Sequence, residues 1–370
     1  MSARFLTVVL ERAFNMRDGF GREIDYMRIS VIDSCNLNCY YCNPCDNNEH
    51  CHALNILSVK EVLCIVRAAT RLGIKHFRLT GGEPLLHPQL DEMVLQIKKI
   101  PGVSSVSLTT NAVLLAQHAK WLKEAGIDSI NVSLDTIDAS EYERITKKPL
   151  LEEVKHGINA AIECGIRVKI NVVLTPQTDV VALTRYVAKK GTDIRFIEMM
   201  PVGEGHTNGV EPYKKVIGTL SKLYGEPCRI NTEKTKEINS GNDKRKIPDN
   251  GPAEYYIFPE LGIRVGLIQA IHGKFCDTCN RIRVTADGRL MPCLGSSVTM
   301  DLVPDSCEFT DDLEKDFVIA QALKAAIKAK PGCHNFNDNA VTYTKTTETK
   351  TTEIEAAEVN AARNMSRIGG

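Results

Sequence analysis

Six strand-like segments alternate with helix-like segments between residues 27 and 200, and this alternation constrains the fold more than any other feature of the chain. The strand-like segments are rich in Ile, Val and Leu. They cover residues 27–33, 76–82, 105–111, 129–135, 167–174 and 193–200. Because alternating strands and helices fold as parallel strands joined by right-handed crossovers, the sequence predicts an α/β protein.

The helix-like segments carry the residues expected at helix ends. They cover 58–73, 112–126, 151–165 and 179–191. Ser58 is followed three residues later by Glu61, the pattern of a capping box at a helix N-terminus. Each segment ends at a glycine, which favours the C-terminus of a helix: Gly73, Gly126, Gly165 and Gly191.

Polar side chains recur at every second position of several strand-like segments. His76, Arg78 and Thr80 would share one face of a strand, as would Lys169 and Asn171. A flat, doubly wound sheet and a partly closed barrel both fit six strand–helix units. Polar faces on neighbouring strands need a wet interior, so we expect an open barrel that lines a ligand cavity.

The pattern changes after about residue 210. We expect a helix over 213–225, a polar connection over 231–251, antiparallel strands within 253–293 with a turn at Asp287-Gly288, and a helix over 315–329. Residues 340–360 are rich in Thr, Glu and Lys and are expected to form a flexible tether. We therefore predict four regions, namely an N-terminal extension (1–24), the barrel (25–245), a C-terminal α+β region (246–339) and a tether with a Gly-Gly tail (340–370).

Charge and hydropathy argue against two classes of partner. The chain has 46 basic and 46 acidic residues, whereas dedicated nucleic-acid binders usually carry a basic excess. No run of 18 apolar residues is present, and the apolar stretch near the N-terminus is too short for a signal peptide. We expect a cytoplasmic protein that binds neither nucleic acid nor a membrane.

Thirteen cysteines include two groups of three. Cys35, Cys39 and Cys42 follow the first strand, and three thiolates in one short loop can hold three corners of a [4Fe–4S] cluster and leave the fourth iron open to a small molecule. A structural zinc site is the alternative. Four nearby side chains are available to complete it: Cys45, Cys51, His50 and His52.

The second group, Cys276, Cys279 and Cys293, flanks the expected turn, so a hairpin can bring its members together. A zinc knuckle is again the alternative, completed by Cys307, His272 or Cys333. Arg281 and Arg283 would share one strand face beside these cysteines. Two guanidiniums placed there point to an anion or a polar base, and an ion pair on the strand is the simpler alternative for each.

Gly81-Gly82-Glu83-Pro84 ends the second strand, at the barrel mouth that the first cysteine loop also occupies. Cys-x3-Cys-x2-Cys followed by GGEP resembles the radical S-adenosylmethionine (SAM) superfamily. The resemblance implies a partial (βα)6 TIM-like barrel, in which SAM chelates the open iron and is cleaved to a 5′-deoxyadenosyl radical. It also implies these SAM contacts: Gly81, Gly82, Glu83, Thr110, Asn111, Ser133 and Met200.

Longer segments narrow the resemblance to the superfamily members that act on GTP in molybdenum cofactor biosynthesis. They include GREIDYMRISVIDSCNLNCYYC, FRLTGGEPLL, INVSLDT, IRFIEMMPVG and CDTCNRIRVTADGRLMPCL. The resemblance implies two [4Fe–4S] clusters, the second in the C-terminal extension, and conversion of GTP to (8S)-3′,8-cyclo-7,8-dihydroguanosine 5′-triphosphate. A radical SAM enzyme that modifies a peptide is the alternative.

In these relatives the open iron of the second cluster holds guanine and cations surround the nucleotide. The matching residues here are Arg28, Arg78, Lys169, Arg195, Arg281 and Arg283. The terminal Gly369-Gly370 would thread into the site and, with Arg281 and Arg283, take part in catalysis. His76 stands where a phosphate-facing Lys is expected, and Ala112 where Gly is usual.

The resemblance also implies partners beyond GTP. It implies an electron donor such as flavodoxin or ferredoxin, and a cyclic pyranopterin monophosphate synthase as the next enzyme of the pathway. A homodimer is compatible with it, and the sequence leaves the oligomeric state open.

Overall fold

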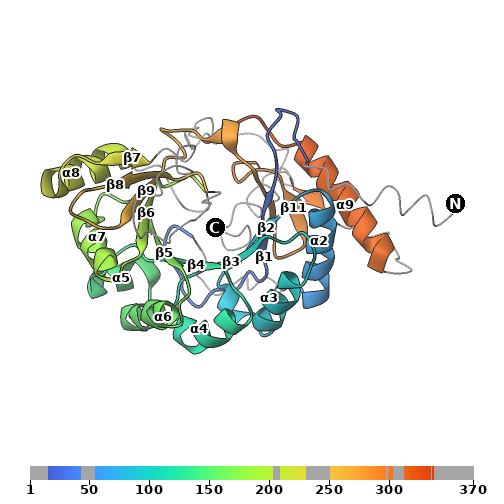
Figure 1. Cartoon of the computed structure of the whole chain (residues 1–370), viewed down its shortest axis with the longest axis horizontal. Helices are drawn as coiled ribbons and strands as arrows, with labels where there is room; N and C mark the ends of the chain where they lie inside the picture. Colours follow the sequence, from blue (N-terminus) through green and yellow to red (C-terminus); the bar gives the residue numbers. More distant parts are fainter. Residues whose placement is uncertain are drawn as a thin grey trace, which may run out of the picture.

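The predicted open α/β barrel is present in the computed structural model, which describes residues 16–42, 55–202, 209–230, 251–296, 299–302, 312–334 and 336. The described strands form one twelve-stranded sheet in the order β12-β11-β10-β1-β2-β3-β4-β5-β6-β9-β8-β7. Figure 1 shows the sheet as a curved wall with helices on its outer side.

The six predicted strands form the parallel centre of the sheet, in chain order. They are β1 (Tyr26–Ser30), β2 (His76–Thr80), β3 (Ser105–Thr110), β4 (Ser129–Ser133), β5 (Val168–Val173) and β6 (Asp193–Ile197). Each is shorter than its apolar run in the sequence, because the last residues of each run leave the sheet and enter the loops at its carboxyl edge.

The four predicted helices are confirmed, and Ser58 and Glu61 form the predicted capping box. The predicted helices are α2 (Val59–Arg71), α4 (Leu115–Glu124), α6 (Leu151–Glu163) and α7 (Val180–Lys189). The barrel also contains α3 (Leu90–Lys98) and α5 (Ala139–Thr146). The pattern analysis did not identify α3 and α5. A short 3-10 helix, Pro84–Leu86, follows β2.

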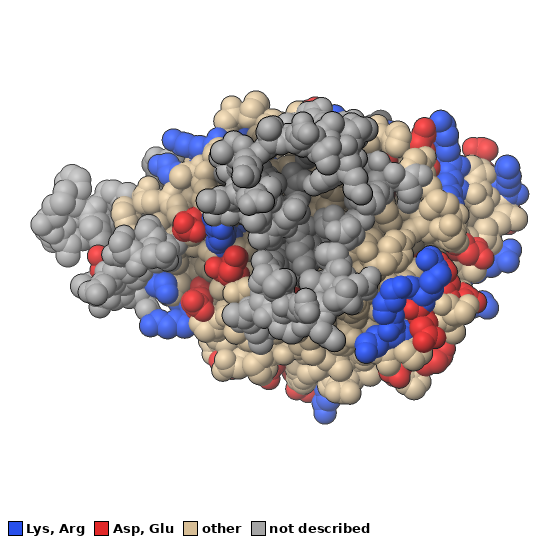
Figure 2. Space-filling model, turned by 180° about the vertical axis from the view of Figure 1, so that it is seen from behind, with Lys and Arg blue, Asp and Glu red and all other residues tan. Residues whose placement is uncertain are grey.

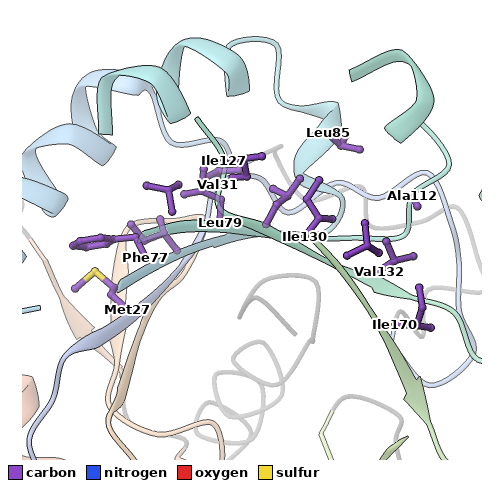
Figure 3. Packing of buried hydrophobic residues seen from close by; sticks show 14 of the residues in the cluster. Met27, Val31, Phe77, Leu79, Leu85, Ala112, Ile127, Ile130, Val132 and Ile170 are labelled. Carbon is purple, nitrogen blue, oxygen red and sulfur yellow. The ribbon is translucent and has the colours of Figure 1, made fainter. Parts of the chain in front are cut away.

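The hydrophobic core lies between the sheet and these helices. Met27, Phe77, Leu79, Ile130 and Ile170 point from the convex face of the strands toward the helices (Figure 3). All five are almost completely buried, and burying a side chain of this size contributes about 1.5–3 kcal/mol. Because side chains alternate along a strand, the residues between them face the concave side.

The C-terminal region extends both edges of the barrel sheet. Its strands are β7 (Cys228–Ile230), β8 (Glu254–Ile257), β9 (Arg264–Ile268), β10 (Arg281–Val284), β11 (Arg289–Met291) and β12 (Met300–Asp301). The predicted antiparallel pairing holds for β8 with β9 and for β10 with β11. It is incomplete, because β9 also pairs in parallel with β6, and β10 with β1.

The predicted C-terminal helices are also present. The first begins as a π-helix (Tyr213–Ile217) and continues as α8 (Gly218–Tyr224). The last, α9 (Asp312–Lys328), packs beside α2 (Figure 1). Asp316 on α9 pairs with Arg67 and Arg71 of α2, at 2.8 Å and 3.4 Å.

The parallel pairing of β10 with β1 separates the two cysteine groups. Arg281 at the start of β10 pairs with Tyr26 at the start of β1. Cys279 precedes β10, so it lies at the amino edge of the sheet, whereas Cys35 follows β1 at the carboxyl edge. A short 3-10 helix, Cys276–Thr278, leads into β10.

The described surface opposite to the view of Figure 1 carries Lys and Arg side chains intermingled with Asp and Glu (Figure 2), in keeping with the net charge of zero. Within the described part of the chain, no helix is long and apolar enough to cross a membrane.

Candidate active site

One cavity of about 610 Å³ lies on the concave side of the sheet. It is lined by every predicted site residue that the structure describes: Cys35, Cys39, Cys42, Gly81, Gly82, Glu83, Thr110, Asn111, Ser133, Met200, Arg28, Arg78, Lys169, Arg195, Cys276, Cys279, Arg281, Arg283 and Cys293. Gly369 and Gly370 lie outside the described residues, as do Cys45, Cys51, His50, His52, Cys307 and the tether.

The glycine pair after β2 packs against the loop that carries the first cysteines. A Cβ atom built on Gly82 would lie 2.1 Å from the carbonyl oxygen of Ser34, and one on Gly81 would lie 2.4 Å from that of Ile32. The backbone nitrogen of Gly82 donates to Ile32 O at 2.7 Å, and that of Glu83 donates to Ser34 O at 2.8 Å. Both glycines are therefore needed for the loop before Cys35 to approach β2.

Glu83 links this turn to the end of β3. Its carboxylate accepts hydrogen bonds from the Thr110 hydroxyl at 2.6 Å, the Asn111 backbone nitrogen at 2.7 Å and the Leu85 backbone nitrogen at 3.1 Å. Burial raises the pKa of Glu83 to about 7, although these donors oppose the shift. The side chain of Asn111 donates to Asn36 Oδ1 at 2.7 Å, so the same chain of contacts reaches the first cysteine loop.

The first three thiols lie partly buried, close to the carboxylates of Glu83 and Asp135. Burial raises the pKa of Cys35 to about 11 and that of Cys42 to about 12, and it raises the pKa of Cys39 further. Thiols in such a place ionise only when a cation is bound beside them, and thiolates are the ligands that iron–sulfur clusters use. This donor set therefore fits a [4Fe–4S] cluster with three protein ligands.

The second group is held by two contacts that the sequence analysis did not identify. Arg22 donates to Cys276 O at 2.7 Å and pairs with Asp18 at 2.6 Å. Glu198, after β6, accepts from the backbone nitrogens of Ile271 and His272 and from the His272 ring. In the sequence, Arg22 was marked only by its place in the segment GREIDY, and Glu198 only by its place in IRFIEMM. Both segments belong to the family resemblance described above.

A row of guanidiniums crosses the cavity wall. Arg28 on β1 lies in register with Arg283 on β10 and with Arg78 on β2. Burial, together with the neighbouring Arg281, lowers the pKa of Arg283 to about 10, and burial next to Arg283 lowers that of Arg28. These cations destabilise one another in the protein alone, which favours an anionic ligand between them.

Tyr26 lies beside this row and was not predicted as a site residue. Its hydroxyl accepts a hydrogen bond from Arg78 Nε, and Arg78 Nη1 donates to Leu108 O at 3.2 Å. Although burial alone would raise it, the pKa of Tyr26 is lowered by the guanidiniums of Arg78 and Arg28. His76 on the neighbouring strand stacks on Tyr26, with ring centroids 6.4 Å apart.

Arg195 on β6 faces the same cavity with one donor unused. Its Nε donates to Asn171 Oδ1 at 2.9 Å, but its buried Nη2 has no hydrogen-bond partner among the described residues. Of the described residues that line the cavity, only Glu83 and Asp128 are acidic. A buried guanidinium with an unsatisfied donor in a cavity rich in cations fits a polyanion such as a triphosphate.

The zinc alternatives receive no support from the described residues. All six cysteines are free thiols, and no three His, Cys, Asp or Glu side chains among the described residues are grouped closely enough to hold one metal ion. His272 pairs with Glu198, and Cys333 is exposed.

Two family assignments divide the chain. Residues 29–182 match the Radical SAM superfamily, and residues 192–336 match Molybdenum Cofactor Synthesis C. The second match contains Cys276, Cys279 and Cys293 together with both edges that the C-terminal region adds to the sheet.

Curated relatives extend the similarity over most of the chain. A protein named GTP 3′,8-cyclase from Clostridium perfringens is 36% identical over 324 residues, which are 87% of this chain and 95% of the relative. One of the same name from Pelotomaculum thermopropionicum is 37% identical, covering 86% of this chain and 95% of the relative.

Solved structures share the fold at low identity. Streptococcus suis SuiB bound to S-adenosylmethionine is 14% identical, with a TM-score of 0.54 over 81% of this chain and 65% of that protein. Native anSMEcpe with bound AdoMet is 18% identical, with a TM-score of 0.50 over 72% of this chain and 74% of that protein. At these identities the likeness describes the barrel and not the substrate.

Proposed function

Since the chain belongs to the GTP 3′,8-cyclase family of the radical SAM superfamily, we propose that the cavity inside its sheet is the active site in which GTP is cyclised. The chain converts GTP to (8S)-3′,8-cyclo-7,8-dihydroguanosine 5′-triphosphate, the first step of molybdenum cofactor biosynthesis, and it uses SAM and two [4Fe–4S] clusters. The curated relatives favour this reaction over modification of a peptide.

One observation carries the assignment of the site. Two loops with three free cysteines each open into the same cavity from opposite edges of the sheet, with the row of Arg283, Arg28 and Arg78 on the wall between them. The two proposed cofactor sites and the nucleotide site therefore share one cavity.

Cys35, Cys39 and Cys42 would hold the first cluster, and SAM would lie along the carboxyl ends of β2, β3, β4 and β6. The residues proposed to hold SAM are Gly81, Gly82, Glu83, Thr110, Asn111, Ser133 and Met200, all of which line the cavity. Glu83 already accepts three hydrogen bonds inside the protein, so it orients Thr110 and Asn111 as well as any ammonium group that reaches it.

Cys276, Cys279 and Cys293 would hold the second cluster, beside which the guanine of GTP would bind. The triphosphate carries several negative charges, and forked guanidinium donors bind such oxygens best. The cations proposed to bind it are Arg28, Arg78, Lys169, Arg195, Arg281 and Arg283.

When bound, the clusters and SAM supply the radical that takes hydrogen from ribose C3′ and the electrons that complete the cyclisation. The chain supplies position and environment. Arg195, with its free Nη2, and the guanidinium row fix the phosphates, so the ribose lies between the two edges of the sheet. The sheet and the two cysteine loops enclose the reacting carbons and limit the access of water.

The remaining assignments also belong to this proposal. The four regions 1–24, 25–245, 246–339 and 340–370 act as extension, barrel, second-cluster region and tether, and Gly369-Gly370 reach the active site. The protein works in the cytoplasm, receives electrons from a donor such as flavodoxin or ferredoxin, and passes its product to a cyclic pyranopterin monophosphate synthase.

The site is tested with anaerobically reconstituted, reduced protein incubated with SAM and GTP. Wild type should contain about eight irons per chain, two clusters of four, and yield 5′-deoxyadenosine and the cyclised nucleotide. Cys35→Ala should abolish SAM cleavage, whereas Cys279→Ala should still cleave SAM but leave GTP unchanged. Cyclisation at the wild-type rate by Cys279→Ala would contradict the second site.

A further inference from the structure

Lys330 is a buried cation that the proposed function does not use. It follows α9 by two residues, is only 3% exposed, and lines the active-site cavity. Lysines are almost never fully buried unless their charge is compensated, so this one needs a partner.

The contacts of Lys330 point to the second cysteine group. Its ammonium donates a hydrogen bond to the carbonyl oxygen of Pro292, at 2.9 Å, and Pro292 directly precedes Cys293. The same ammonium lies beside the thiol of Cys279. Lys330 therefore contacts Cys279, before β10, and the residue next to Cys293, after β11.

The thiol of Cys279 responds to this cation. Burial alone would raise its pKa, but the ammonium of Lys330 and the guanidinium of Arg281 lower it below the ordinary value. The pKa of Cys276 is raised by burial. The positive charge of Lys330 therefore acts at Cys279.

No carboxylate among the described residues pairs with Lys330. The C-terminus of α9 lies nearby and attracts cations, but this effect is modest and falls off within the last turn. The neighbouring Arg281 and Arg283 add further positive charge. The charge of Lys330 is left to be balanced by whatever the three cysteines hold.

We propose that Lys330 is a positioning residue of the second iron–sulfur cluster, which holds Cys279 and the Pro292–Cys293 turn in register and makes that cluster easier to reduce. The inference rests on the proposed assignment of Cys276, Cys279 and Cys293 as ligands. Reduction adds one electron, taken from a low-potential donor such as dithionite, to a thiolate-ligated group that is already anionic. A buried ammonium beside one ligand stabilises the form with more negative charge.

The test is a redox titration of the anaerobic holoenzyme with dithionite, followed by electron paramagnetic resonance. The Cys35→Ala variant identifies which signal belongs to the second cluster. For Lys330→Met we expect a midpoint of the second cluster at least 59 mV lower, a tenfold weaker reduction for a one-electron couple. The midpoint of the first cluster should not change.

Two further variants separate charge from packing. Lys330→Arg keeps the charge and should retain a midpoint close to that of wild type. Lys328→Met removes an exposed lysine two residues away and should have no effect on either cluster. If the reduction midpoint of the second cluster is unchanged in Lys330→Met, the inference is overturned, even if that variant binds GTP more weakly than wild type.

Iron content distinguishes failure of the inference from failure of the proposed site. Wild type with only about four irons per chain, or Cys279→Ala with wild-type iron, contradicts the second cluster itself. If Lys330→Met loses the second cluster, Lys330→Arg shows whether the charge at this position is what the cluster needs. Restoration of iron and midpoint by Arg supports the role of the charge, and loss in both variants refutes it.

Discussion

Arg22 donates a hydrogen bond from Nη1 to the carbonyl oxygen of Cys276, 2.7 Å away, although 254 residues separate them in the chain. The same guanidinium donates to Pro331 O at 2.6 Å and to Gly332 O at 2.9 Å. It therefore joins the segment before β1, the second cysteine loop and the turn after α9. Asp18 balances its charge from a fully buried position.

Arg22→Met should destabilise the protein and empty the second cluster site. Removing one partner of a buried ion pair costs about 3–5 kcal/mol, because the other charge stays buried and unpaired. We expect a lower melting temperature and a fall from about eight to about four irons per chain, with SAM cleavage retained.

Arg229→Ala is the matched control for the loss of an arginine. Arg229 pairs with Glu254 at 2.7 Å, but both side chains are exposed, and such a pair contributes about 0–1 kcal/mol. If Arg22→Met keeps full iron content, the contact with Cys276 does not hold the second loop.

Gly82→Ala should displace the first cysteine loop. Its Cβ would lie 2.1 Å from Ser34 O, a backbone atom that cannot rotate away. Overpacking of this kind costs about 1–3 kcal/mol or more. We expect loss of iron from the first cluster and of SAM binding, measured by iron analysis and equilibrium dialysis.

Gly218→Ala provides the opposite case. Gly218 begins α8 with helical dihedral angles, and no heavy atom lies within 4 Å of a Cβ built there. Alanine in a helix is favoured over glycine by about 0.5–1 kcal/mol, so this variant should be slightly more stable. Equal stability of the two alanine variants would show that the loop yields to the extra methyl group.

The barrel was predictable because its signals are local. Alternation along β1 and β2 places Ile29 and Leu79 in the core and Arg28 and Arg78 in the cavity, and the sequence pattern contains that information. Ala112, noted as a departure from glycine, adopts φ +66°, which explains why glycine is usual there.

Long-range pairing was not predictable in the same way. The sequence of residues 281–284 does not indicate that they pair with β1, more than 250 positions earlier in the chain, because one strand edge fits many partners. The roles of Arg22, Glu198 and Lys330 were missed for the same reason, since each depends on a backbone carbonyl or amide that only the folded chain brings close.

Glu83 makes stability depend on pH between about 4.5 and 7. Burial raises its pKa from 4.5 in the reference state to about 7, so the folded chain holds the proton more tightly than the unfolded chain. Its contribution is therefore fully present below about pH 4.5 and is lost as pH rises to about 7. Glu83→Gln removes this titration.

Thermal unfolding of the two proteins at pH 5.5 and pH 8 measures the effect. Wild type should be more stable relative to Glu83→Gln at the lower pH than at the higher one. A difference in melting temperature that stays the same at both values would mean that the three donors to Glu83 outweigh its burial and keep it ionised throughout.

Arg283→Met should raise the stability of the protein without nucleotide and weaken GTP binding. Burial and the neighbouring Arg281 lower the pKa of Arg283 to about 10, so its charge opposes folding. An apolar side chain of similar volume avoids the cost of burying a cation next to Arg281. A lost hydrogen bond to phosphate costs about 1.5–3 kcal/mol of binding, or roughly 10–150-fold in affinity.

Melting temperature without nucleotide and GTP affinity by calorimetry test the two effects together. Arg289→Met, in the same hairpin, is the control, because Arg289 forms an exposed pair with Asp301 at 3.2 Å and should change neither quantity much. If Arg283→Met lowers both stability and affinity, the contacts that Arg283 makes within the protein outweigh the cost of burying its charge. If the two move in opposite directions, the guanidinium row is maintained for the ligand at the expense of the fold.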